Sequence, residues 1–162
     1  MKTLLILRHA KSSWDDPKLS DHDRPLNERG RATAPKISRW ILENGLIPDK
    51  IISSTAIRAR QTTELIAQYG NFNKSVEFNH QLYDAPTSAY IEVLNQQTNE
   101  LNCILLVGHN PTLEQLLEKL TGVRELLPTA ALAQIEFSLN SWNELTLATR
   151  GRLIQIFKPK EI

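Results

Sequence analysis

Short apolar runs and amphipathic segments alternate along the first three quarters of the chain. Three runs are rich in leucine, isoleucine and valine and show little polar alternation, which is typical of parallel strands covered on both faces of a sheet. They occupy residues 3–7, 50–53 and 102–107. We therefore expect these three runs to be strands of one sheet.

The segments that follow these runs have the apolar spacing of helices. The predicted helices cover residues 31–44, 59–69, 89–97 and 111–121. Glycine follows three of them, at Gly45, Gly70 and Gly122, and we expect each glycine to form a C-terminal cap. Thr87 or Ser88 is expected to cap the start of the third helix.

The pattern changes after residue 128. Residues 131–139 and 151–157 alternate apolar and polar side chains, which predicts a strand pair at the far side of the sheet, joined by a connection that contains Trp142. The alternation of strands and helices predicts an α/β fold, a three-layer sandwich with a mostly parallel central sheet and helices on both faces. A chain of 162 residues is too short for two ordinary domains, so we expect one domain over residues 1–162.

Composition narrows the classes of function. Lys and Arg number 19 against 18 Asp and Glu, a formal charge of +1 without a long run of either sign, so nothing favours nucleic acid or an anionic membrane as a partner. No apolar run approaches membrane-spanning length, and residues 4–7 are too short for the core of a signal peptide. The one cysteine, Cys103, lies in an apolar run and predicts a buried, inert thiol, so we expect a cytoplasmic protein.

Polar side chains stand where the predicted parallel strands end. The first strand runs into Arg8 and His9, the second leads into a helix whose first turn carries Arg58, and the third ends just before His109. Ligands of open α/β sheets bind beyond the carboxyl ends of the strands. We therefore expect these side chains to meet at one edge of the sheet, whereas Arg60 points elsewhere.

Two kinds of site explain only part of this set. A metal ion can use imidazoles, but the sequence has neither HExxH nor CxxC, and the permanent charge of Arg8 beside His9 repels a dication. Serine chemistry can use Ser53 or Ser54, but no G-x-S-x-G elbow is present. Both alternatives leave the arginines unexplained, and we expect no metal.

A phosphoryl group explains the arginines. Guanidinium groups bind its oxygens with paired hydrogen bonds, and positive charge around phosphorus stabilises the transition state. A neutral imidazole is a competent nucleophile toward phosphorus, and it forms a phosphorylated histidine that water then hydrolyses. The strand-end residues therefore predict phosphoryl chemistry that needs no cofactor.

Four motifs occur along the chain in the order RHAKSSW, DRPLNERG, SSTAIRARQT and VGHNP. Together they resemble the histidine phosphatase superfamily, whose fold is phosphoglycerate-mutase-like, and most closely its short bacterial phosphohistidine phosphatase branch (SixA-like). The resemblance implies that His9 is the phosphorylated nucleophile and that Arg8 clamps the phosphate beside it. It also implies that Arg58 is the second arginine of the phosphate pocket and that His109 bonds a phosphoryl oxygen.

The resemblance is weaker at the general acid. Larger members of the superfamily have a glutamate after the second helix, whereas this chain reads HQLYDAPTSAY there, with Asp84 as the nearest carboxylate. Asp84 is either the general acid or a cap of the following helix. Lys11 and Ser12 follow the nucleophile, and they either add donors to the phosphate site or are solvated.

Other polar and aromatic residues near these motifs have no predicted part in the chemistry. Trp14 either lines the mouth of the pocket or packs within the core or its loop. The rest are expected to fix the loop, as Asp21, Asp23 and Arg24, or to lie on the surface, as His22 and His80.

The predicted function is dephosphorylation of phosphohistidine on a partner protein. A phosphoramidate asks little of an enzymic acid once its leaving nitrogen is protonated, and the short chain leaves little room for a lid over the pocket. A broad small-molecule phosphomonoesterase is the alternative enzyme. A phosphoprotein-binding module with weak turnover is the alternative from another class, and nothing in the pattern indicates an oligomeric state.

Overall fold

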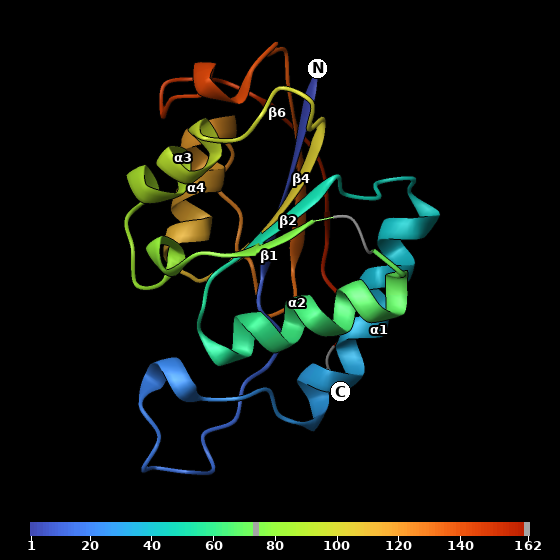
Figure 1. Cartoon of the computed structure of the whole chain (residues 1–162), viewed down its shortest axis with the longest axis vertical. Helices are drawn as coiled ribbons and strands as arrows, with labels where there is room; N and C mark the ends of the chain where they lie inside the picture. The colour runs from blue at the N-terminus through green and yellow to red at the C-terminus, as the bar shows by residue number, and fades with distance from the viewer. Residues whose placement is uncertain (73–74, 161–162) are drawn as a thin grey trace.

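The computed structural model describes residues 1–72 and 75–160 (Figure 1). Within them, six strands form one sheet and four α-helices cover it. The strands are β1 (Lys2–Arg8), β2 (Lys50–Ser53), β3 (Val76–Phe78), β4 (Cys103–Gly108), β5 (Leu132–Phe137) and β6 (Arg152–Phe157). The helices are α1 (Glu28–Glu43), α2 (Ile57–Gly70), α3 (Thr87–Asn95) and α4 (Thr112–Thr121), with short 3-10 helices η1 (Asp21–Asp23), η2 (His80–Leu82) and η3 (Trp142–Glu144).

The strands follow the order β3-β2-β4-β1-β5-β6 across the sheet. β1, β2, β3 and β4 run parallel, whereas β5 pairs antiparallel with both β1 and β6. A mostly parallel sheet with the late strand pair at one side is therefore confirmed. Because β5 runs in the opposite direction, its first residues lie at the edge where β1 and β4 end.

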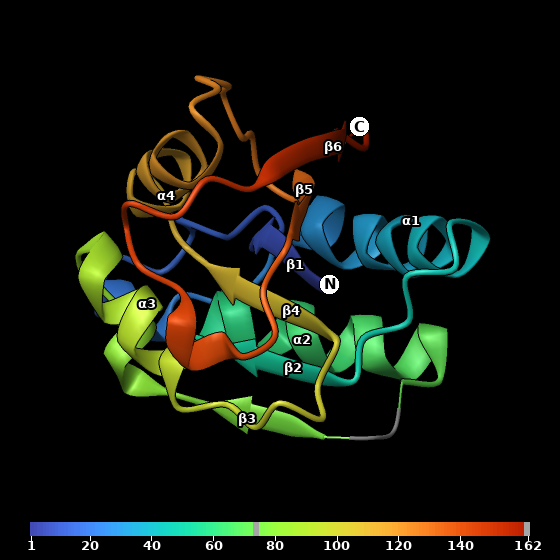
Figure 2. The same ribbon diagram turned by 90° about the horizontal axis from the view of Figure 1, so that it is seen from above.

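The side chains of β1 alternate between two apolar layers. Leu4 and Ile6 pack with residues of α3 and α4 on one face of the sheet, and Leu5 and Leu7 pack with residues of α1 and α2 on the other. Figure 2 shows the sheet between the two pairs of helices. A strand covered on both faces has no solvent side to make polar, which explains its continuous apolar run. The predicted three-layer sandwich is confirmed.

The first two helices differ from the prediction at their ends. α1 begins earlier than expected, because the side chain of Asn27 accepts a hydrogen bond from the backbone N–H of Gly30 and caps the helix (2.9 Å). α2 continues through Gly70, and Asn71 adopts the left-handed conformation in its place (φ 56°). A Cβ at position 70 would lie 2.3 Å from the Phe72 ring, so this glycine is required by packing.

Two of the three predicted glycine caps are present, whereas the predicted cap of α3 is not. Gly45 and Gly122 occupy the left-handed positions after α1 and α4, as expected (φ 64° and 75°). The cap predicted for α3 is wrong, because Pro86 precedes its first turn and the cap makes no side-chain hydrogen bond. Thr87 is already helical and buried, and its hydroxyl accepts a hydrogen bond from Nζ of Lys119 (3.3 Å).

The connection between β5 and β6 contributes to the core. Trp142 of η3 is fully buried, and its indole N–H donates to the carbonyl oxygen of Leu101 (2.8 Å). Cys103, at the start of β4, is half-buried rather than buried, and desolvation raises the pKa of its thiol to about 12. Across residues 1–72 and 75–160, no helix has the length and apolar character to cross a membrane.

Candidate active site

β1 and β4 bring two histidines together. The strands pair in parallel with Arg8 opposite Gly108, and the backbone N–H of His9 donates to the carbonyl oxygen of Gly108 (3.2 Å). His9 and His109 therefore leave neighbouring strands at the same level. Their ring centroids lie 5.2 Å apart, and both side chains are buried.

β2 places α2 beside this pair. The backbone N–H of Ser54, directly after β2, donates to the carbonyl oxygen of Val107 in β4 (3.0 Å). Arg58 lies in the first turn of α2, and its buried guanidinium brings Nε to 3.3 Å from Nε2 of His9. Arg60 lies over the Phe78 ring instead, 3.9 Å from its centroid.

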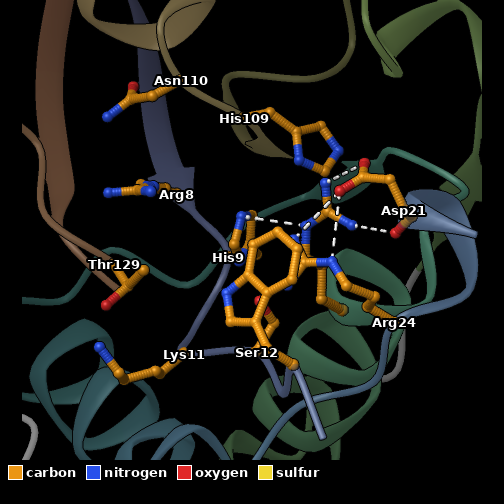
Figure 3. Close-up of a pocket in the computed structure, with 11 residues that line it drawn as sticks. Arg8, His9, Lys11, Ser12, Asp21, Arg24, His109, Asn110 and Thr129 are labelled. Atoms are coloured by element: carbon orange, nitrogen blue, oxygen red, sulfur yellow. Dashed lines mark hydrogen bonds and ion pairs between the residues drawn. The ribbon is translucent and has the colours of Figure 1, made fainter. Parts of the chain in front are cut away.

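The four residues predicted from the strand ends line one cavity of about 390 Å³, shown in Figure 3. The full lining consists of Arg8, His9, Lys11, Ser12, Trp14, Asp21, Arg24, Arg58, His109, Asn110 and Thr129. Its permanent cations outnumber its one carboxylate, so the cavity suits a small anion. Lys11 and Ser12, which are predicted either to add donors to the phosphate site or to be solvated, both lie in this wall.

Hydrogen bonds fix the tautomer of His9. Nδ1 lies 2.7 Å from the carbonyl oxygen of Ala10, which can only accept, so Nδ1 carries the proton. Nε2 then holds the lone pair, toward which Nε of Arg58 donates. Burial lowers the pKa of His9 well below 6.5 and outweighs the hydrogen bond to the Ala10 carbonyl, which acts to raise it, while the charges of Arg58 and Arg8 lower it further. The ring is therefore neutral at pH 7.

The partners of His109 define its tautomer as well. Its Nε2 lies 2.8 Å from Oγ of Ser54, and that oxygen also accepts from the backbone N–H of Ala56 (3.2 Å). If the Ser54 hydroxyl gives its own proton to Nε2, the neutral ring carries its proton on Nδ1. This Nδ1 is buried and has no hydrogen-bond partner in the part of the chain that the structure describes. Burial, followed by the charge of Arg58, lowers the pKa of His109 to about 3, so an incoming anion meets a neutral donor.

Asp21 belongs to the site, although the sequence predicts only a loop-fixing role for it. Its Oδ2 accepts from Nη2 of Arg58 (3.0 Å) and from the hydroxyl of Tyr83 (2.8 Å), and its backbone carbonyl accepts from Nη1 of Arg58 (2.7 Å). Burial acts to raise the pKa of Asp21, but Tyr83, Arg58 and Arg24 outweigh it and lower this pKa to about 2. The carboxylate is therefore ionised.

Arg24 and Trp14 form the outer wall of the cavity. Nε and Nη2 of Arg24 donate to Oδ1 of Asp21 (3.2 and 3.1 Å), and Nη1 donates to Oγ of Ser12 (2.9 Å). The Arg24 guanidinium lies 3.5 Å from the centroid of the Trp14 ring, which is 75% exposed. Trp14 thus lines the mouth, whereas a core position is excluded. Arg24 fixes the loop as predicted and also faces the cavity.

The two histidines expected on the surface have partners. His22 is half-buried and His80 exposed, and both approach the hydroxyl of Thr55, at 3.0 Å from Nε2 of His22 and 2.9 Å from Nδ1 of His80. Both rings also lie against Tyr83, with centroid distances of 4.7 and 5.8 Å. The predicted surface position is right for His80, which is exposed. The prediction leaves out that both histidines pack against Tyr83, whose hydroxyl donates to Asp21.

Asp84 lies outside the main cavity. It is exposed, has a left-handed backbone (φ 49°), and lines a smaller cavity of about 220 Å³ that also touches His109 and Asn110. The capping alternative is wrong, since the cap position of α3 is Pro86. The general-acid role of Asp84 stays a prediction, while Asp21 is the carboxylate in the wall beside His9.

The segment before β5 closes the cavity from the other side. Nη1 of Arg8 donates to the carbonyl oxygen of Leu127 (3.2 Å). The backbone N–H of Ala130 lies 3.1 Å from the carbonyl oxygen of Arg8 and 3.0 Å from that of His9, and Ala130 holds a left-handed conformation (φ 65°) to make this contact. This strained residue fixes the end of β1 from which His9 projects.

Known proteins share this sequence pattern and fold. Residues 4–85 match the family model of the histidine phosphatase superfamily (branch 1). An uncharacterized chloroplastic protein of Arabidopsis thaliana is 35% identical over 152 residues, which cover 88% of this chain and 70% of that protein.

Solved structures extend the likeness over nearly the whole chain. A protein of Agrobacterium tumefaciens, provisionally assigned as the phosphohistidine phosphatase SixA, has a TM-score of 0.83 and 34% identity, covering 98% of both chains. The protein histidine phosphatase SixA in complex with tungstate has a TM-score of 0.81 and covers 95% of both chains, and at 22% identity it bears on the fold alone. The predicted phosphoglycerate-mutase-like fold class is confirmed.

Proposed function

The chain belongs to the histidine phosphatase superfamily, and we propose that it hydrolyses phosphohistidine by attack of His9 on phosphorus. One observation carries this proposal. The bond from Nδ1 to the Ala10 carbonyl leaves the lone pair of a neutral ring on Nε2, beside Arg58 and inside a cationic cavity. A nucleophilic imidazole needs this state, because a protonated Nε2 has no electron pair to give.

In the first step the phosphoryl group replaces His9 as the acceptor for Arg58. Arg8, Arg58 and Nδ1–H of His109 donate to its nonbridging oxygens and stabilise the charge that spreads over them in the transition state. The second nitrogen of the substrate ring first takes a proton from solvent. The lone pair of Nε2 then forms the new bond to phosphorus while the bond to the leaving nitrogen breaks, and that electron pair stays on the leaving ring, which departs as neutral imidazole. The Nδ1 proton stays on His9, where Ala10 holds it.

In the second step water hydrolyses the phosphorylated His9. The water oxygen bonds to phosphorus, the bond to Nε2 breaks, and the electron pair returns to His9. The proton from water passes to phosphate or solvent. Guanidinium groups supply the positive charge around phosphorus, so the proposed mechanism requires neither metal nor cofactor.

We propose phosphohistidine on a partner protein as the preferred substrate. The likeness to the Agrobacterium tumefaciens protein supports it, because the two chains cover each other almost completely at 34% identity. The mouth also supports it, since Trp14 and Asp21 are half or more exposed and a large partner can approach them. A cytoplasmic setting is proposed from composition, on the single cysteine.

Phosphate release tests the proposal directly. The substrates are a histidine-containing protein phosphorylated with phosphoramidate, and p-nitrophenyl phosphate, each with EDTA present. We expect wild type to prefer phosphohistidine, His9→Ala to be inactive on both, and Arg58→Ala to lose about 100-fold in kcat/KM. Arg60→Ala is the matched control, because Arg60 lies on Phe78 outside the cavity, and it should stay near wild type.

Three other results would contradict the proposal. Full activity of His9→Ala refutes the assigned nucleophile. Turnover of the aryl phosphate alone indicates a small-molecule phosphomonoesterase. Tight binding of the phosphoprotein without phosphate release indicates a binding module.

A further inference from the structure

We infer that Asp21 is a specificity-determining residue whose carboxylate faces the leaving group and selects phosphoryl donors whose phosphorylated ring is a protonated, cationic imidazole, which departs as neutral imidazole. This inference rests on the proposed function. It places a carboxylate of η1, in the wall of the cavity, beside the leaving group, with an electrostatic role and not the general-acid role that is one alternative for Asp84.

The first support is that His9 lies deeper in the cavity than Asp21. His9 is 6% exposed and forms the floor, whereas the side chain of Asp21 is 51% exposed and stands in the wall toward solvent. Phosphoryl transfer places the attacking and leaving atoms roughly in line on opposite sides of phosphorus. A nucleophile on the floor therefore directs the leaving group to the level of Asp21. Figure 3 shows His9 and Asp21 among the residues that line this cavity.

The second support is that Asp21 is held in place as an anion. Arg58 and Tyr83 bond to Oδ2, and Arg24 bonds twice to Oδ1. The pKa of about 2 follows from these bonds, so Asp21 is a fixed negative charge at neutral pH and not a proton donor. A fixed carboxylate favours a neighbouring group in its cationic form.

A phosphohistidine ring has such a form, because its second nitrogen can take a proton from solvent. Asp21 then stabilises the protonated ring, whose bond to phosphorus is weaker than that of the unprotonated ring. When Nε2 of His9 bonds to phosphorus and the old bond breaks, the electron pair neutralises the protonated ring, which leaves as imidazole. Atoms and charge balance without a proton from Asp21.

The same carboxylate disfavours an anionic leaving group. p-Nitrophenyl phosphate releases a phenolate, which a negative charge at the mouth repels. Removing the charge of Asp21 should therefore lower the activity on phosphohistidine without lowering the activity on the aryl phosphate. Simple loosening of Arg58 predicts instead an equal loss on both, since each substrate presents the same phosphoryl oxygens.

The test compares kcat/KM of Asp21→Asn on the phosphoramidate-treated histidine protein and on p-nitrophenyl phosphate. We expect a loss of about tenfold on phosphohistidine and no loss on the aryl phosphate. Asp21→Glu keeps the charge and should retain the preference. Asp23→Asn is the control, because Asp23 is exposed and bonds to His22 at 3.3 Å rather than to the cavity arginines.

Two results overturn the inference while leaving the proposed function intact, namely an equal loss on both substrates or unchanged kinetics in Asp21→Asn. A wild-type chain that leaves phosphohistidine intact overturns both proposals. Thermal unfolding of each variant identifies any loss of fold, and a destabilised Asp21→Asn is replaced by Asp21→Ser for the same comparison.

Discussion

At the scale of single residues, the hydrogen-bond partner of a histidine ring determines which ring nitrogen carries the proton. Ser54 is buried, its Oγ accepts a hydrogen bond from the backbone N–H of Ala56, and the same Oγ lies 2.8 Å from Nε2 of His109. If the Ser54 hydroxyl donates to Nε2, the proton of the neutral His109 ring lies on Nδ1, which has no partner within the described residues. Ser54 makes no contact with phosphate in the proposed mechanism, but its hydrogen bond then sets the tautomer of His109, which does.

Replacing Ser54 with alanine should reduce catalysis through His109. We expect kcat/KM to fall about tenfold, because loss of the Nε2 bond leaves Nδ1 only partly protonated and weakens the donor to the phosphoryl oxygen. ¹⁵N chemical shifts of the ring should show the proton distributed over both nitrogens. Ser53→Ala is the matched control, since that buried hydroxyl donates to the carbonyl oxygen of Ser54 and not to a ring. An unchanged tautomer would contradict this explanation.

Residues at strand ends are predictable in a way that loop residues are not. The directions of β1 and β4 alone place His9 and His109 at one edge, so their proximity follows from the apolar runs that precede them. Asp21 is held beside His9 by contacts with Arg58 and Tyr83, which are 37 and 62 residues away in the chain. No local pattern encodes such contacts. The DxxR spacing of Asp21 and Arg24 was the one available signal.

At the scale of elements, the start of α1 and the segment after β1 form one packed unit. Gly30 lies so close to this segment that an added Cβ would meet the carbonyl oxygen of Lys11 at 2.2 Å. The backbone N–H of Asn27 also donates to that oxygen (3.0 Å). The helix start therefore fixes the backbone only two residues beyond the nucleophile.

Gly30→Ala should disturb both stability and activity. The overlap involves backbone, which cannot move as a side-chain end can, so we expect a loss of about 1–3 kcal/mol in the free energy of unfolding despite the better helix propensity of alanine. Displacement of Lys11 should also lower kcat/KM. Urea denaturation and steady-state kinetics measure the two effects. Arg29→Ala, at an exposed position of the same turn, should change neither, and a Gly30→Ala chain with wild-type stability would contradict the close packing.

Elements were predictable where their apolar pattern is long. α4 carries four leucines on one face and ends at Gly122, and both features are present in the structure. β3 has only three residues and none of them is buried, so it lacks the signal of a strand. The start of α1 was placed late because the Asn27 cap precedes the first apolar residue of the helix.

At the scale of the whole molecule, the active site makes folding sensitive to acid. His9 and His109 have lowered pKa values in the folded chain, whereas both protonate near pH 6.5 when the chain is unfolded. The unfolded chain then binds more protons, so stability is fully present above pH 6.5 and is lost as the pH falls below it. His109, with a folded-state pKa of about 3, should remove roughly 2 kcal/mol between pH 7 and pH 5, and His9 acts in the same direction.

Urea denaturation at pH 7 and pH 5 measures this loss. His109→Gln cannot protonate at this position, so roughly 2 kcal/mol of the loss should disappear in that variant. Equal stability of the wild-type chain at the two pH values would contradict neutral, buried rings.

The three-layer fold was predictable from the sequence because its strands and helices alternate and its strands are apolar throughout. The close fit of η1 over the cavity was not, since it depends on tertiary contacts of Arg24, Arg58 and Tyr83. The general outline thus follows from local patterns, whereas the wall that faces the leaving group follows from the assembled molecule.

The central claim is that His9 carries the phosphoryl group during turnover. The most direct test mixes the protein with a phosphohistidine protein labelled with ³²P, stops the reaction in alkali within milliseconds, and maps the labelled peptide by mass spectrometry. We predict transient label on His9, lost in His9→Ala. Phosphate release with no labelled enzyme at any time, or label on another residue, would contradict the account.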